Sequence, residues 1–215
     1  MTERGGAVTS TFDRDRALLI RLWRSWAERA RALSDEQWTA PTRLPGWTVR
    51  DLYVHVAPDA LIALIADPAP EGTAKVTSAA EMLRVFNADP VAAEPMHRRI
   101  AEMVRHAATD AGRETLVERF AVELPQAFDR LTGLDRETVV PHPLLGSVTL
   151  GALLDLAILE TTVHLLDVVD TVGGPPPESE ALERTRNVLA AVPDARDFIE
   201  AASGRSGARI LPVMR

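Results

Sequence analysis

The stretch LPGWTVRDLYVHVA, residues 44–57, contains the clearest helix start in the chain. Thr48 followed three residues later by Asp51 has the spacing of a capping box, in which each residue bonds the backbone N–H of the other. Trp47 precedes the cap and Leu52 follows it, the arrangement in which two apolar side chains fix the angle at which the chain enters a helix. The stretch therefore predicts a helix that begins directly after Thr48.

This helix is expected to begin at Val49 and to kink or stop one residue after Val56. Pro58 follows closely, has no backbone N–H to donate, and disfavours helical geometry in the residue before it. His55 falls beside the apolar stripe of the helix and not opposite it. A histidine in that position is either a hydrogen-bonded core residue or a ligand, and the local pattern alone leaves both interpretations open.

Apolar residues three and four apart predict helices over most of the remaining chain. Trp23 and Trp26 are expected in the core. Strand signals are confined to residues 138–140, and an extended loop is expected around Pro141 and Pro143. The further predicted helices cover residues 11–33, 78–87, 95–111, 113–134 with a bend at Pro125, 149–172, and one or two segments within 178–202.

These segments predict an all-α protein, an up-down bundle of four long helices with a short helical C-terminal appendage. Two glycines and three prolines at residues 173–177 end the last long helix. We therefore expect residues 1–172 to form the bundle. Residues 173–215 are expected to form a Gly/Pro linker, the appendage and a tail.

Composition excludes several classes of function. Lys and Arg number 24 against 31 Asp and Glu, and the net charge of −7 disfavours nucleic acid and anionic membranes as partners. The longest uncharged run, residues 138–154, is interrupted by prolines and shorter than a membrane-spanning helix. The first residues lack the apolar segment of a signal peptide, so a cytoplasmic location is expected. Because the chain has no cysteine, any thiol chemistry needs an external thiol.

Glu160 and His164 are the strongest candidates for a metal site within one helix. Four residues apart, they project from the same helix face and can chelate one ion, although this spacing also occurs by chance in many helices. The alternative for Glu160 is that it faces water. His55 is the candidate third ligand from another helix, and two imidazoles with one carboxylate are a ligand set of catalytic zinc sites that keep an open fourth position.

The motif LPGWTVRDLYVHVA, followed by ETTVHLLDV at residues 160–168, resembles the metal-binding domain of the mycothiol-dependent maleylpyruvate isomerase family. That family is a branch of the DinB-like four-helix bundles, and the resemblance covers roughly residues 12–172. It implies that His55, Glu160 and His164 bind a divalent metal, usually zinc.

The resemblance also implies a reaction, in which the metal activates mycothiol or a related small thiol as a nucleophile. The thiol either adds to a conjugated cis double bond and returns the trans isomer, or stays attached to an electrophile as in an S-transferase. The alternative is a non-catalytic, metal-stabilised binding or regulatory scaffold. An acidic residue is frequent in the family at the position of Asp167, where it orients a ligand imidazole or faces solvent. The identities of the metal and of the substrate stay open. The oligomeric state is open too, and a homodimer is one alternative.

Three further histidines and two arginines are weaker candidates for the site. His97 and His106 are expected on a solvated helix face, where nearby arginines offer a weaker alternative as a basic stripe for an anion. His142 is interpreted as a loop residue, with a cavity-lining role as the alternative. Arg205 and Arg209 in the tail could fold back over the site to bind a carboxylate or a sugar hydroxyl, but nothing in the sequence indicates that they do.

Overall fold

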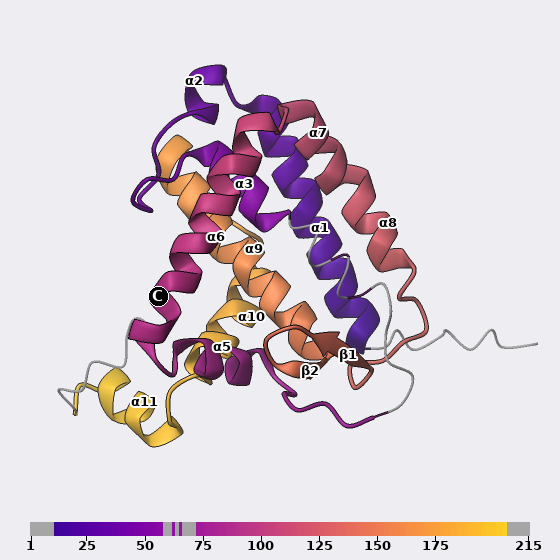
Figure 1. The fold of residues 1–215 in the computed structure, drawn as a ribbon, viewed down its shortest axis with the longest axis vertical. Helices are drawn as coiled ribbons and strands as arrows, with labels where there is room; N and C mark the ends of the chain where they lie inside the picture. The colour runs from indigo at the N-terminus through magenta and orange to yellow at the C-terminus, as the bar shows by residue number, and fades with distance from the viewer. Residues whose placement is uncertain (1–10, 58–61, 63–64, 66–71, 206–215) are drawn as a thin grey trace, which may run out of the picture.

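Helix α9 (Leu150–Val172) lies between helix α1 (Thr11–Ala32) on one side and α10 (Ser179–Ala190) on the other (Figure 1). The computed structural model describes residues 11–57, 62, 65 and 72–205. The side chain of Thr149 accepts a hydrogen bond from the N–H of Ala152 and starts α9 at its predicted position. Apolar residues are buried on both sides of this helix, which makes it the central element of the bundle.

The other elements are mostly helical, and the predicted all-α fold is confirmed. None of the described helices is long and apolar enough to cross a membrane. In chain order the remaining elements are α2 (Asp35–Trp38), α3 (Val49–Val56), α5 (Ala79–Asn87), α6 (Pro90–Asp110), α7 (Arg113–Glu118), the π-helix η1 (Arg119–Glu123), α8 (Leu124–Asp129), β1 (Val139–His142), β2 (Gly146–Thr149) and α11 (Ala195–Ala202).

Helix α3 begins and ends as predicted. The side chain of Thr48 accepts from the N–H of Asp51, and the Asp51 carboxylate accepts from the N–H of Thr48 at 2.7 Å, which completes the capping box. The helix ends at Val56 with Ala57 as its C-cap. Pro58, on which the prediction of that end was based, lies outside the described residues.

A cluster of aromatic side chains joins α1, α3 and η1 in the core. The ring of Trp26 stacks on Phe120 at 5.4 Å and meets Tyr53 edge-on at 4.6 Å. The indole N–H of Trp26 donates to the carbonyl of Thr161 on α9 at 3.2 Å. Trp26 is fully buried, and Trp23 almost so, which confirms their predicted place in the core.

The helix predicted over residues 113–134 is present as α7, η1 and α8, and it ends earlier, at Asp129. Its large buried residues, Leu116, Phe120, Leu124 and Phe128, recur every four positions. In an α-helix each such step drifts by about 40° around the axis, because four residues exceed one 3.6-residue turn. A π-helical turn holds more residues and offsets that drift, which keeps these side chains directed at α1. The interruption also lies directly before Pro125, whose ring and missing N–H disturb an α-helix.

Helix α6 begins at Pro90, five residues before the predicted start at position 95. The prediction placed the start at about Pro95, and proline is favoured in the first turn of a helix. Pro90 has that place instead, and Pro95 lies inside the helix. Proline has no N–H to donate to the carbonyl one turn earlier in the helix. This is tolerated because Pro95 is on an exposed side of α6, where water can bond that carbonyl instead.

The loop predicted around Pro141 and Pro143 is instead a β-hairpin, so this prediction was wrong. Strands β1 and β2 pair antiparallel, with His142 opposite Gly146. Gly146 has a φ of +77°, a conformation that favours glycine and that lets the chain reverse within three residues. Val148 is buried and also pairs with Val76, which ties the hairpin to the segment before α5.

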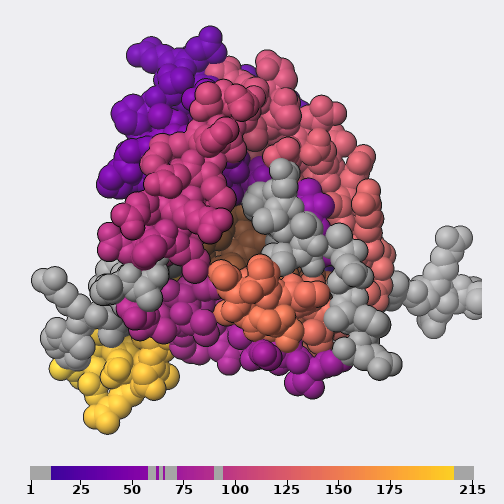
Figure 2. Space-filling view, in the orientation of Figure 1, coloured from indigo at the N-terminus to yellow at the C-terminus, as the bar shows by residue number. Residues whose placement is uncertain are grey.

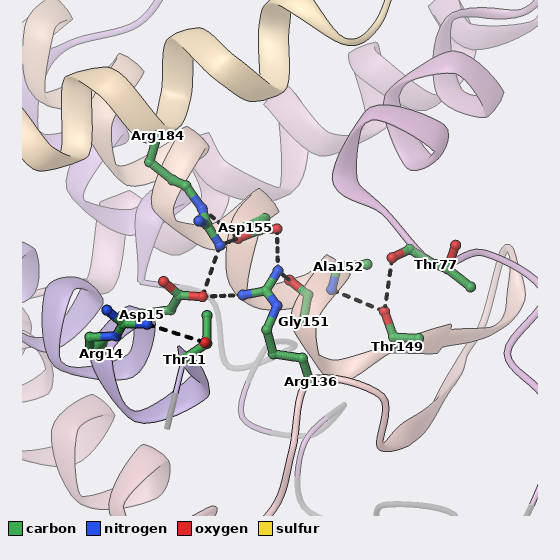
Figure 3. Close-up of polar contacts among 10 residues, drawn as sticks. All are labelled: Thr11, Arg14, Asp15, Thr77, Arg136, Thr149, Gly151, Ala152, Asp155 and Arg184. Carbon is green, nitrogen blue, oxygen red and sulfur yellow. Dashed lines mark hydrogen bonds and ion pairs between the residues drawn. The ribbon is translucent and has the colours of Figure 1, made fainter. Parts of the chain in front are cut away.

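A network of two arginines and two aspartates fastens α10 to the bundle (Figure 3). Arg184 on α10 donates to Asp15 on α1 at 2.8 Å and to Asp155 on α9 at 2.7 Å. Arg136, in the segment before β1, bonds both aspartates as well. Each carboxylate is thus shared by two guanidinium groups, which compensates for taking the charges largely out of water.

The C-terminal helices differ in how they pack. Helix α10 lies against α9 and α1, and its Ala181 is fully buried. Helix α11 has no buried residue. The division into a bundle ending at residue 172 and a separate C-terminal part stays a prediction.

The charge network gives a stability prediction. In Arg184→Ala, Asp15 and Asp155 retain Arg136 alone. Breaking a fully buried pair costs about 3–5 kcal/mol, and because the Arg184 side chain is 30% exposed we expect a loss of about 2–3 kcal/mol in the free energy of unfolding. Urea-induced unfolding at neutral pH measures it.

The control is Arg196→Ala, which removes an exposed ion pair with Glu200 within α11. Exposed pairs contribute little, so we expect a change of no more than about 0.5 kcal/mol. Equal effects of the two substitutions would show that the network does not fasten α10.

Candidate metal centre

Three side chains from two helices meet at one point beside α9. His55 comes from the last turn of α3, and Glu160 and His164 come from successive turns of α9. The Nε2 atom of His55 lies 3.7 Å from Oε2 of Glu160, and Nε2 of His164 lies 3.3 Å from the same oxygen. One donor atom from each residue lies within 4.8 Å of the other two. Within the described part of the chain, no second group of three such side chains comes as close.

Contacts in the aromatic core fix the position of α3 relative to α9. Tyr53, two residues before His55, donates its hydroxyl to the carbonyl of Trp26 at 3.1 Å. Trp26 in turn donates to the carbonyl of Thr161, the residue after Glu160. Burial raises the pKa of Tyr53, which keeps its phenol protonated as the donor. The distance between His55 and Glu160 is therefore set by contacts that run through α1.

His164 is oriented by a hydrogen bond to Asp167. The Nδ1 atom of His164 lies 2.8 Å from Oδ2 of Asp167, and since a carboxylate can only accept, Nδ1 carries the proton. Asp167 is buried, so the alternative in which it faces solvent is wrong. Its second oxygen, Oδ1, accepts from Nε of Arg43 at 2.6 Å. The bond at Nδ1 leaves Nε2 of His164 directed at Glu160.

His55 is oriented by ring packing. Its imidazole meets the Trp47 ring edge-on, with 5.2 Å between centroids, and the His164 ring in the same way at 4.9 Å. No hydrogen-bond partner for its Nδ1 is found among the described residues. Trp47, expected only to fix the entry into the helix, thus also contacts a site residue.

The pKa values of the cluster follow from a balance between burial and opposite charge. Burial opposes ionisation of Glu160, but hydrogen bonding and charge from His164 and His55 outweigh it and lower the pKa of this carboxyl to about 2. Burial also opposes protonation of His164, yet Asp167 and Glu160 raise its pKa to about 9. The cluster without a metal thus holds a proton between Glu160 and His164, and a cation bound there would displace it.

The donor set fits a tetrahedral divalent ion. Zinc binds imidazole nitrogen and carboxylate oxygen at 2.0–2.2 Å, so neighbouring ligand atoms lie roughly 3.3–3.5 Å apart around it. The two nitrogen-to-oxygen distances, 3.3 and 3.7 Å, are close to that separation. All three donor atoms lie within 4.8 Å of one another, so the set could hold a single ion and leave a fourth position for another ligand.

The cluster is not sealed from solvent. The side chains of His55 and Glu160 keep 26% and 31% of their surface exposed. Figure 2 shows that the surface is hollowed between α6 and the β-hairpin, where Figure 1 places α9 behind. Solvent therefore reaches two of the three side chains of the cluster.

None of the other candidate residues that the structure describes belongs to this cluster. His97 and His106 are exposed on α6, as expected for a solvated face. His142 ends strand β1, where its Nδ1 accepts from the N–H groups of Leu144 and Leu145 within the hairpin loop, and burial lowers its pKa. Arg205 is exposed after α11, and Arg209 lies outside the described residues.

Sequence reasoning missed Arg43. The residue directly precedes the LPGW turn, but no spacing rule connects it with Asp167, because the two positions are 124 residues apart. The only signal for Arg43 in the sequence is its position beside the helix-entry motif, and this signal is weak.

Comparison with known families gave one match. The chain matches the family described as "Mycothiol maleylpyruvate isomerase N-terminal domain" over residues 19–169, which is more than half of its length. Comparisons with curated proteins and with solved structures gave no match. The matched range includes α3 and nearly all of α9, and so all three residues of the cluster. The chain therefore belongs to the mycothiol maleylpyruvate isomerase N-terminal domain family.

Proposed function

We propose that this protein is a metal-dependent enzyme that activates a low-molecular-weight thiol, mycothiol or a close relative, as a nucleophile. The observation that carries the proposal is the convergence of His55, Glu160 and His164 from two helices in a chain that belongs to a mycothiol-related family. The reaction is either transfer of the thiol to an electrophile or thiol-assisted isomerisation of a cis double bond.

The need for a metal follows from the chemistry of thiols. A thiol with a pKa of about 8.5 is only a few per cent ionised at pH 7, whereas a divalent metal ion at its sulfur deprotonates it. The chain has no cysteine, so the sulfur comes from a small molecule. A cytoplasmic location belongs to this proposal, since free thiols are kept reduced there.

The charges of the three proposed ligands suit an anionic fourth ligand. Two neutral imidazoles and one carboxylate cancel only half of the charge of a divalent ion, so the site would keep a single positive charge for a thiolate to neutralise. Glu160 is held ionised by its two histidine neighbours, and Asp167 holds the proton of His164 on Nδ1, away from the site. Zinc is the proposed ion, because this ligand set is typical of catalytic zinc sites.

Metal content tests the ligand assignment. We expect wild-type protein reconstituted with Zn²⁺ and desalted to retain a single ion per chain, measured by elemental analysis. His55→Ala and Glu160→Gln remove a ligand each and should lose most of the metal. His106→Ala, which removes an exposed histidine on α6, is the matched control and should retain it. Full metal content in His55→Ala would remove that residue from the ligand set.

Thiol-dependent turnover tests the reaction. With mycothiol and either an aryl halide or a conjugated cis-alkene at pH 7, removal of the metal should lower the rate about thirtyfold or more, since a free thiol is roughly 3% ionised there. The advantage should shrink as the pH rises through 8.5, where the thiol ionises unaided. Retained metal without thiol-dependent turnover across a panel of electrophiles and alkenes would contradict the enzyme and favour the scaffold.

A further inference from the structure

Arg43 connects the loop before α3 with the C-terminal third of α9. Its side chain is half exposed, yet its Nε donates at 2.6 Å to Asp167, whose side chain is only 4% exposed. The backbone that carries Arg43 is itself fixed, because Thr42 donates its N–H to the carbonyl of Trp47 at 2.8 Å and Trp47 donates to Leu44 at 3.0 Å. The guanidinium thus reaches α9 from a loop that is already ordered.

The Asp167 carboxylate is held at both oxygens. Oδ1 accepts from Arg43, and Oδ2 faces Nδ1 of His164 at 2.8 Å. A carboxylate with one partner can turn about its Cβ–Cγ bond, whereas a carboxylate with two partners on different elements cannot do so without breaking one contact. The orientation of the His164 ring therefore depends on a side chain outside α9.

This support matters more for His164 than for the other ligand histidine. His55 packs edge-on against Trp47 and has no partner at Nδ1 among the described residues, so ring contacts set its orientation. For His164, the bond to Asp167 keeps Nδ1 as the donor to that carboxylate, and it leaves Nε2 directed at Glu160. Loss of that bond would let the ring present the wrong nitrogen.

We propose that Arg43 is a positioning residue for the metal site, which acts through Asp167 to hold the His164 imidazole with Nε2 directed at the ion. The inference rests on the proposed function, since it needs a metal at this cluster. It assigns to an exposed loop arginine an effect on metal affinity that an exposed ion pair alone would not have.

Charge and position predict opposite effects of removing Arg43, and this makes the proposal testable. Arg43 is a cation near a cation site, so charge alone predicts that its removal strengthens metal binding. Positioning predicts weaker binding. Partners of ligating histidines change metal affinity by about 10- to 100-fold, and for Arg43→Ala we expect a loss of about tenfold.

The experiment measures the dissociation constant of Zn²⁺ by competition with a chromophoric chelator at pH 7 and fixed ionic strength. Arg43→Ala should bind about tenfold more weakly than wild type. Arg43→Gln should recover most of the loss, because the Nε2 amide of glutamine stands as many bonds from Cα as Nε of arginine. Arg21→Ala is the matched control, since Arg21 is similarly exposed and pairs with Glu178 far along the chain, and its affinity should equal that of wild type.

A double-mutant cycle tests whether Arg43 acts through Asp167. In an Asp167→Ala background, Arg43→Ala should cause no further loss of Zn²⁺ affinity. Thermal unfolding of each metal-free variant, followed by circular dichroism, confirms that the compared proteins are folded.

The outcomes separate this inference from the proposed function. Unchanged or tighter Zn²⁺ binding in Arg43→Ala, an equal loss in Arg43→Gln, or an undiminished loss in the Asp167→Ala background would each overturn the role of Arg43 while the metal site stands. Absence of Zn²⁺ binding by the wild-type protein would overturn both proposals.

Discussion

The hydrogen bond from the indole of Trp26 to the carbonyl of Thr161 is the contact on which the geometry of the candidate site depends. Together with the bond from Tyr53 to Trp26, it connects α3 to α9 through a single residue of α1. Helix α3 has only eight residues, too few to be stable alone in water. The position of His55 is therefore set by contacts in the core. The three side chains of the cluster come together because Trp26 connects α3 with α9 in the folded bundle.

The site also satisfies its own charges in a chain of alternating sign. Arg43, Asp167, His164 and Glu160 follow one another, each in contact with the next at 3.3 Å or less. Such alternation explains how several ionisable groups can be partly buried without a large penalty for leaving water. A metal ion that replaced the proton on His164 would continue the same alternation, so the folded chain needs no large rearrangement to receive it.

Local signals in the sequence predicted the parts of the structure that short stretches of chain determine. The capping box at Thr48 and Asp51 gave the start of α3, and Glu160 and His164 could be paired because a helix brings positions four apart together. His55 was the candidate third ligand because it lies beside the apolar stripe of another helix, and the family resemblance implied it as well. The contact between Arg43 and Asp167 and the network around Arg184 join distant segments, for which no spacing rule exists. The hairpin was missed because two prolines concealed a short strand.

The π-helical turn before Pro125 makes the length of that segment as important as its composition. Counted along the helix, the turn is equivalent to one inserted residue, and it compensates for apolar side chains spaced four apart. If the same residues wound as a regular α-helix, everything beyond the turn would rotate by about 100°. Phe128 would then leave the edge of Trp23, which it now meets with 4.9 Å between ring centroids. Deletion of one residue between Arg119 and Glu123, with conversion of the turn to regular α-helix, should in contrast leave Phe128 facing Trp23.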